Sequence, residues 1–319
     1  MSPRARGMRS GPPQLHFKRS HRSAFSRTAL RIADRGLSLF QAVGRRCAVR
    51  SLGPMLLTFL SLAHSTAMQA EQVPVRHLEG ITHGFLVLRT LEGQILANGD
   101  LTQNSNGDRV TSELEFRFKD GSIHKETAVF SQHRNFRLIS DHLVETGAAF
   151  RHPIDVLVDG SSGKVTIRYT EDDGKEKVTN ERMKLPEDVS NGLILTLLKN
   201  IPAQTPSMTV SMVAATPKPR LVKLKIVRQG EDPFSIAGSE HKAVHYVVKV
   251  EIGGVAGVVA PLVGKQPPDT HIWILGGTAP TFVRLEGPLY EGVPVWRIEL
   301  ISPTWPGESK EAPQTEKQN

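Results

Sequence analysis

Alternation of apolar and polar residues, repeated along the chain after residue 79, is the feature that most restricts its fold. The clearest case is residues 110–118, with the sequence VTSELEFRF. In an extended strand, the two charged glutamates and the arginine of this segment fall on one face. The opposite face carries Val110, Ser112, Leu114, Phe116 and Phe118. A period of two predicts a half-buried strand of an antiparallel sheet.

Turn signals separate many such segments. The pair Asp120-Gly121 directly after the first strand predicts a hairpin, and the segments 216–220 and 230–233 predict further breaks. The spacing of the turns favours a mainly β, antiparallel meander. Later strands are expected at 123–130, 134–140, 154–158, 165–169, 176–183, 207–215, 220–228, 243–252, 271–275, 281–286 and 294–301.

One helix is expected, over about residues 186–201. Pro186 suits its first turn, and Pro202 would end it. Its apolar residues recur at helical spacing and cover a wide face, which favours burial of the helix against a sheet. These residues are Val189, Leu193, Ile194, Leu197, Leu198 and Ile201.

The positive charge of the chain is confined to its beginning. Residues 1–50 hold twelve Arg and Lys against one acid, a net charge of about +11, whereas residues 71–319 hold 28 basic and 31 acidic residues. A basic surface is what a nucleic-acid-binding domain needs, so this function is excluded for the later part of the chain. The leader 1–50 is expected to be disordered or not translated.

Residues 51–70 resemble an export signal in layout. Arginines precede the apolar run LGPMLLTFLSLA, and small residues follow it, which predicts cleavage near Ala63, Ala67 or Ala70. The protein is then expected to be periplasmic or secreted, without a transmembrane helix in the mature chain. A buried helix, a signal anchor and an organelle transit peptide stay open as alternatives. We expect a single β-rich domain over 76–303 and a disordered tail over 304–319.

Cysteine usage excludes several chemistries. Cys47 is the one cysteine, and it lies before the apolar run, so the mature chain would contain none. Disulfides, thiolate zinc sites and cysteine nucleophiles are therefore excluded. Lipidation at the cleavage site is unsupported for the same reason.

The glycine-rich stretch GGVAGVVAPLVGKQPPD, residues 253–269, does not match a nucleotide loop. Gly264-Lys265 is followed by Gln266 rather than by Ser or Thr, and the glycine spacing does not fit a dinucleotide fold. A bent strand, a mobile apolar flap over a cavity and a membrane-dipping tip remain open. As a flap it would offer the ligand-facing candidates Val255, Val258, Val259, Leu262 and Val263.

No catalytic, cofactor or metal residue is predicted. His241 and His245 share a strand face, and His271 lies in a later strand, but no HExxH motif accompanies them. The sequence also lacks a nucleophile elbow and a pair of carboxylates with the spacing of acid–base catalysis. Trp273 and Trp296 are more typical of core anchors than of ligand platforms.

A resemblance adds to this picture. A short apolar helix, two strands, and then HIWILGGTAPTFVRLEGPLYEGVPVWRIEL over 271–300 follow the early meander. This layout resembles exported bacterial proteins of unknown function that form an incomplete antiparallel β-barrel, similar to the periplasmic lipoprotein-carrier half-barrels. The resemblance implies a curved sheet or incomplete barrel around one buried helix, and it transfers no functional residue.

Three functions are compatible with the sequence. The first is a non-enzymatic exported protein that binds an apolar small molecule or lipid in a curved β-sheet. The second is a structural envelope protein that contacts a protein partner through an exposed strand edge. The third is a metal-dependent hydrolase that uses the strand histidines.

Overall fold

A computed structural model describes residues 71–171, 173–236, 238–251, 267–289, 294–301 and 303–304. The leader, the export signal and residues 305–319 of the expected tail lie outside these residues, whereas Thr304 belongs to a strand. So does the stretch 252–266, which holds the five ligand-facing candidates Val255, Val258, Val259, Leu262 and Val263.

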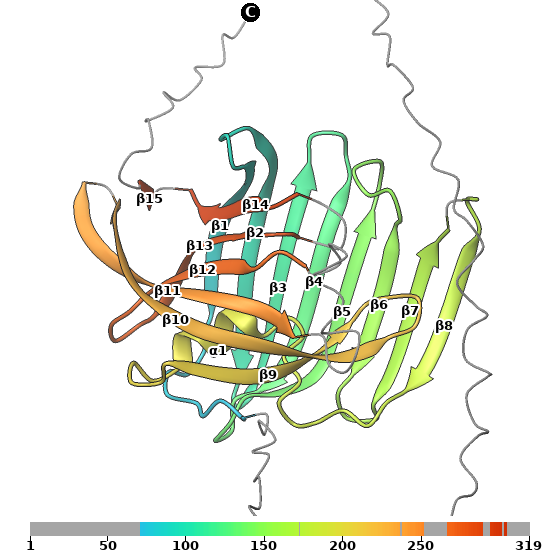
Figure 1. The fold of residues 1–319 in the computed structure, drawn as a ribbon, viewed down its shortest axis with the longest axis horizontal. Coiled ribbons are helices and arrows are strands. Elements are labelled where there is room, and N and C mark those ends of the chain that lie inside the picture. Colours follow the sequence, from blue (N-terminus) through green and yellow to red (C-terminus); the bar gives the residue numbers. More distant parts are fainter. Residues whose placement is uncertain are drawn as a thin grey trace, which may run out of the picture. The chain divides into compact units, whose positions relative to one another are not determined.

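The first half of the described chain is a meander of eight antiparallel strands, each paired with the next (Figure 1). Their bounds are β1 Thr82–Thr90, β2 Ile95–Asn106, β3 Arg109–Phe118, β4 Ile123–Ser131, β5 Arg137–Thr146, β6 Ile154–Asp159, β7 Lys164–Thr170 and β8 Glu176–Arg182.

The second half begins with the helix α1, Ile194–Asn200, and continues with seven strands. These strands are β9 Ser207–Ala214, β10 Arg220–Ile236, β11 Ser239–Glu251, β12 Thr270–Leu275, β13 Thr281–Gly287, β14 Trp296–Leu300 and β15 Pro303–Thr304.

Strand β1 joins the two halves into one 15-stranded sheet, because it pairs with β2 on one side and with β14 on the other. Figure 1 shows β9 to β14 crossing β1 to β8 at a steep angle, with α1 beside the crossing. Among the described residues, β8 pairs only with β7, and the sheet does not close into a barrel. The expected mainly β, antiparallel, incomplete-barrel architecture is confirmed.

The inner face of the bent sheet forms the core. Buried side chains from both halves belong to one apolar cluster, which includes Leu86 and Phe116 from the first half and Ile226 and Ile272 from the second. The alternation predicted for residues 110–118 is confirmed, since Val110 and Phe116 are completely buried and Arg117 is exposed. Strand pairing therefore decides which side chains face the core.

The hairpin expected after this strand is also present. Gly121 adopts a φ of 86°, which glycine tolerates best, and the backbone amide of Ser122 donates to the Asp120 carboxylate over 2.9 Å. The turn connects β3 to β4, and its local chemistry sets the register of this pair.

The helix is shorter than predicted. Residues 186–193 are not helical, because Val189 bridges to Ser211 of β9 and Ser190 donates its backbone amide and its hydroxyl to the Ser211 carbonyl. Gly192, with a φ of +64°, then redirects the chain into α1. Burial of the helix is confirmed by Leu198, which is 1% exposed.

The break expected at 230–233 is wrong, because β10 continues through it to Ile236 with a bulge between Arg228 and Gly230. Pro233 has no amide hydrogen, but β11 is the one strand that pairs with β10 at this position among the described residues. The proline therefore leaves the pairing with β11 intact.

No helix in the described part of the chain is long and apolar enough to span a membrane.

Gly99 tests the close packing of β2 on β3. A β-carbon at this position would lie 2.4 Å from the Phe116 ring, whereas one on Gly80 would meet nothing within 4 Å. We expect Gly99→Ala to lower the free energy of unfolding by about 1–3 kcal/mol, because the ring cannot move within the core. Urea unfolding measures this, with Gly80→Ala as the control, and equal effects of both substitutions would contradict the packing.

Candidate functional site

One glutamate interrupts an apolar row on the inner face. Strand registers place Glu126 of β4 between Leu114 of β3 and Leu143 of β5. The whole row, from β2 to β7, consists of Leu101, Leu114, Glu126, Leu143, Val156 and Ile167. A carboxyl group in the middle of such a row is exceptional, since inward positions of a sheet are normally apolar.

Three more ionisable side chains lie beside Glu126 on the inner face of β4 and β5. His124 lies opposite Glu145, and its Nδ1 is 2.9 Å from the Glu145 Oε1. On the other side of Glu126, Ala128 lies opposite Asp141. His124, Glu145 and Asp141 are all buried. We call His124, Glu126, Asp141 and Glu145 the inner carboxyl cluster.

Burial raises the pKa of the Glu126 carboxyl, because a low-dielectric surrounding disfavours its charged form. The positive field of His124 opposes this effect and the negative charge of Glu145 adds to it. Glu126 itself is only half-buried, so the group is desolvated by the surrounding protein while part of it remains accessible.

Asp141 is the most deeply placed member, with 2% of its surface exposed. Its Oδ1 is buried without a hydrogen-bond partner among the described residues. Burial raises the pKa of Asp141 well above its usual range, and the nearby charge of Glu126 raises it further. Because the charge of Glu126 acts on Asp141, the protonation of one group affects the titration of the other.

The turn before the helix covers this cluster. A β-carbon on Gly192 would lie 2.8 Å from the Asp141 Oδ1 and 2.6 Å from the Ala128 Cβ. The absence of a side chain at residue 192 is therefore what allows the turn to approach β4 and β5. The side chains that follow Gly192 on the inward side are apolar, since Leu193 and Leu197 are buried.

This arrangement can hold a proton between buried carboxyls, and it can accept hydrogen bonds from a donor that enters the inner face. It does not gather ligands for a metal ion, since no group of three or more His, Cys, Asp or Glu side chains suited to a metal occurs among the described residues. Perturbed titration inside a concave surface is typical of functional sites.

The strand histidines considered in the sequence lie on the outer face. Nε2 of His245 is 2.9 Å from Nδ1 of His271, and the His245 ring stacks on Trp273 at 4.5 Å. His241 instead contacts the ring of Phe234. The structure thus brings two of the three histidines together and leaves the third apart.

Asp232 completes this outer group, because it accepts the indole hydrogen bond of Trp273 over 2.7 Å. Burial lowers the pKa of His245, and the charge of Asp232 partly offsets this. The rings of His245 and His271 thus pack against each other and against the buried indole of Trp273. Trp273 acts as the expected core anchor in the small apolar cluster of Phe234, Ala243 and Val283.

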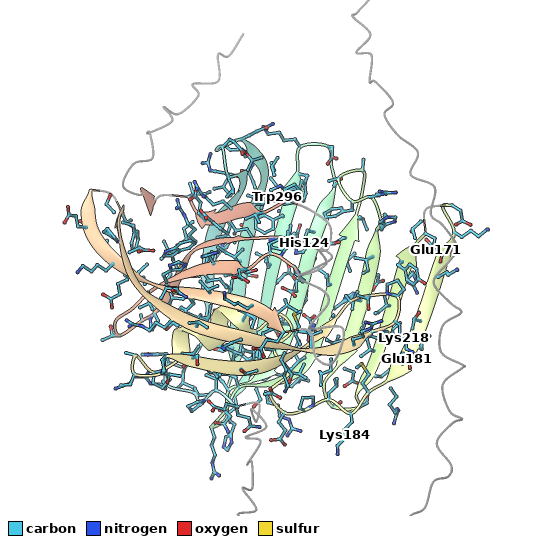
Figure 2. All side chains as sticks on the ribbon, in the orientation of Figure 1. His124, Glu171, Glu181, Lys184, Lys218 and Trp296 are labelled. Carbon is cyan, nitrogen blue, oxygen red and sulfur yellow. The ribbon has the colours of Figure 1, made fainter. Side chains whose placement is uncertain are left out.

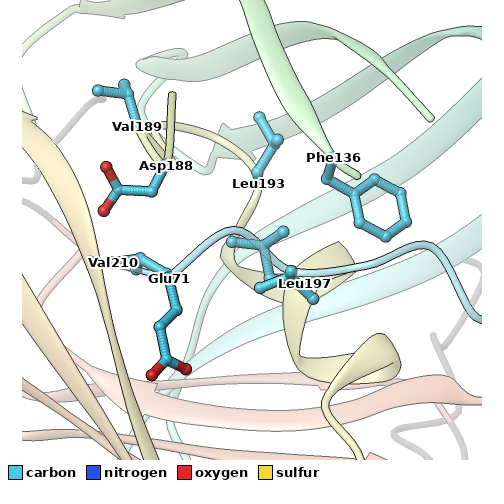
Figure 3. Close-up of a pocket in the computed structure, with 8 residues that line it drawn as sticks. Glu71, Phe136, Asp188, Val189, Leu193, Leu197 and Val210 are labelled. Atoms are coloured by element: carbon cyan, nitrogen blue, oxygen red, sulfur yellow. The ribbon is translucent and has the colours of Figure 1, made fainter. Parts of the chain in front are cut away.

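Figure 3 shows a narrow pocket beside the helix. Its lining comes from the segment before β1, the connection between β4 and β5, the turn before α1, the helix and β9. It consists of Glu71, Val73, Phe136, Asp188, Val189, Leu193, Leu197 and Val210. Asp188 already accepts the Ser211 hydroxyl. We regard this pocket as a seam between packed elements.

Sequence reasoning missed the inner carboxyl cluster. The signal was present, since His124 and Glu126 stand in phase with Ala128 and Phe130, which are core residues. The outward positions of β4 include apolar residues as well, so the phase of the strand is ambiguous in the sequence. His142, the neighbour of Asp141 in sequence, lies on the outer face beside Asp155, as strand alternation requires.

Side chains from both halves of the sheet surround the inner face (Figure 2). Phe118 of β3 lies 6.3 Å, between ring centroids, from Trp296 of β14, and Phe116 lies 6.2 Å from His124. The aromatic rings thus link the carboxyl cluster to the second half of the sheet.

No protein-family model, no curated protein and no solved structure matches this chain.

The raised pKa of Asp141 predicts a direction for the pH dependence of stability. The folded state binds this proton more tightly than the unfolded state, whose aspartate pKa is about 3.9. The corresponding stabilisation is complete below that pH and is lost as pH rises towards the folded pKa. Asp141→Asn, which stays neutral, should therefore gain stability relative to the native protein as pH rises from 4 to 8, in urea unfolding.

Asp159→Asn is the control, because it should show no such gain between pH 4 and 8. Hydrogen bonds from Ser161 and Ser162 lower the pKa of Asp159, so its stabilisation is present above the unfolded pKa and is lost in acid. An Asp141→Asn variant with the same pH dependence as the native protein would contradict the burial of this carboxyl.

Proposed function

We propose that this chain is a non-enzymatic binding protein that holds an apolar ligand, such as a lipid, on the inner face of its open sheet. The observation that supports it is the row around Glu126. Leu101, Leu114 and Leu143 face inward and remain half-buried rather than buried. Inward apolar side chains that keep accessible surface provide contact area for a further apolar molecule.

The second half of the sheet contributes to the same surface. Leu285, Trp296 and Leu300 also face inward and are half-buried. Half-exposed apolar residues on both halves would contact a ligand from two sides. Contact from two sides buries more of a ligand than one open face can.

The expected location is part of the proposal. Export through the segment 51–70, with cleavage between Ala63 and Ala70, would deliver the β-rich domain to the periplasm or the exterior. There, a protein that shields an apolar molecule from water would have a role in transport or storage between membranes or partners.

The alternative of an envelope protein that pairs through a strand edge is less favoured. The free edge β8 carries Glu176, Lys177, Glu181 and Arg182, and its side chains are mostly exposed. Charged residues on an edge strand oppose the addition of another strand. A hydrolase that uses the strand histidines is also less favoured, because His241 lies apart from the contacting pair His245 and His271.

Binding of a neutral apolar probe, N-phenyl-1-naphthylamine, tests the proposal. We expect probe fluorescence to rise with the native protein, and Leu143→Asn to weaken binding about tenfold, because about half of a leucine burial is lost. Fluorescence titration gives both dissociation constants.

Leu157→Asn is the matched control, because Leu157 lies on the neighbouring strand but faces outward with 42% of its surface exposed. We expect this variant to bind the probe within about twofold of the native protein. A native protein that does not bind the probe, or equal weakening by both substitutions, would rule out an inner-face site.

A further inference from the structure

Within the described part of the chain, Glu126 makes no direct contact with a cationic side chain. Among the described residues it makes no hydrogen bond or ion pair, and its pKa responds only to burial and to the charges of His124 and Glu145. Lys125, the one lysine or arginine of β4, points to the outer face, where it pairs with Glu113 and Glu115. The cation of this strand is therefore unavailable to the inner carboxyl cluster.

Asp141 gives an independent indication of a missing partner. Its Oδ1 is buried, unpaired and directed at the space bounded by Gly192 and Glu126. An unsatisfied buried acceptor costs about 1–3 kcal/mol, and more where the group is charged. The fold thus keeps two acidic groups in an apolar surface at the expense of stability.

The chemistry of the missing partner follows from this geometry. No group of side chains suited to a metal ion occurs among the described residues, so we do not propose a metal ion as the ligand. A larger cationic group with several N–H donors, placed on an apolar body, would use both parts of the surface. Its donors would meet the accessible carboxyl of Glu126, and its apolar body would lie along Leu114 and Leu143.

We propose that the ligand of the inner face is a basic amphiphile, with a protonated amine at Glu126 and an apolar chain along the neighbouring leucines. This inference rests on the proposed function, since it names the class of ligand for the same surface. Asp141 lies behind Glu126 under Gly192 and is not expected to contact the amine directly.

Three ligands with the same twelve-carbon chain test the inference: dodecylamine, dodecanol and dodecanoate. Each is titrated into the full chain at pH 8, below the concentration at which it forms micelles, by isothermal titration calorimetry. We expect dodecylamine to bind at least about tenfold more tightly than dodecanol, as a charge-assisted hydrogen bond implies, and dodecanoate to bind most weakly.

Two variants assign the preference to Glu126. Glu126→Gln should reduce the ratio of amine to alcohol affinity to near one, because it removes the charge and keeps the shape. Glu113→Gln, on the outer face of the adjacent strand, should keep the ratio of the native protein. Circular dichroism verifies that both variants fold.

The outcomes separate the two proposals. Equal binding of amine and alcohol, or the tightest binding by dodecanoate, overturns the basic amphiphile and leaves an apolar inner-face site standing. An amine preference that Glu126→Gln does not change overturns the assignment to Glu126. If none of the three ligands binds, the proposed function fails, and this inference fails with it.

Discussion

Pairing of β1 with a strand on each side is the constraint on which the rest of the structure depends. Leu86 and Leu88 of β1 are fully buried, and β1 lies between β2 of the first half and β14 of the second half. Because a strand must pair its backbone groups on both sides when it is buried, this double pairing fixes the two halves as one sheet. The inner face, its core and the place of the helix all follow from it.

The inner carboxyl cluster is an exception on this inner face, because ionisable side chains occupy positions where the other side chains are mostly apolar. Desolvation disfavours the charged forms of Glu126 and Asp141, and neither group forms an ion pair among the described residues, although the charge of His124 partly offsets the effect at Glu126. An apolar pair at the same positions would extend the row of leucines and valines without that cost. Residues that lower stability in an otherwise consistent core are typical of sites kept for binding.

The sequence predicted those features that depend on local pattern. The alternation at 110–118 identified a strand and its buried face, and Asp120-Gly121 identified its hairpin. The helix was half right, because the bonds from Ser190 to Ser211 connect segments that are 21 residues apart and outweigh the helical spacing of Val189. Continuation of β10 through Pro233 likewise depends on which partners surround it.

The site was less predictable than the fold. The proposed role of Glu126 depends on Leu114 and Leu143, which strand registers bring beside it. No local spacing in the sequence predicts those registers. The candidates Val255 to Val263 lie outside the described residues and stay predictions. Ionisable residues at inward positions of a strand are the signal that would have indicated this site earlier.

The central claim is that Glu126 and Asp141 are desolvated carboxyls that form no ion pair among the described residues. Site-resolved titration of their side-chain carboxyl carbons by nuclear magnetic resonance tests it most directly, with the exposed Asp159 as an internal reference. The account predicts that both groups titrate above the usual carboxyl range, of about 3.9 for Asp and 4.3 for Glu, whereas Asp159 titrates below it. Titration of Glu126 and Asp141 within or below the usual range would contradict it.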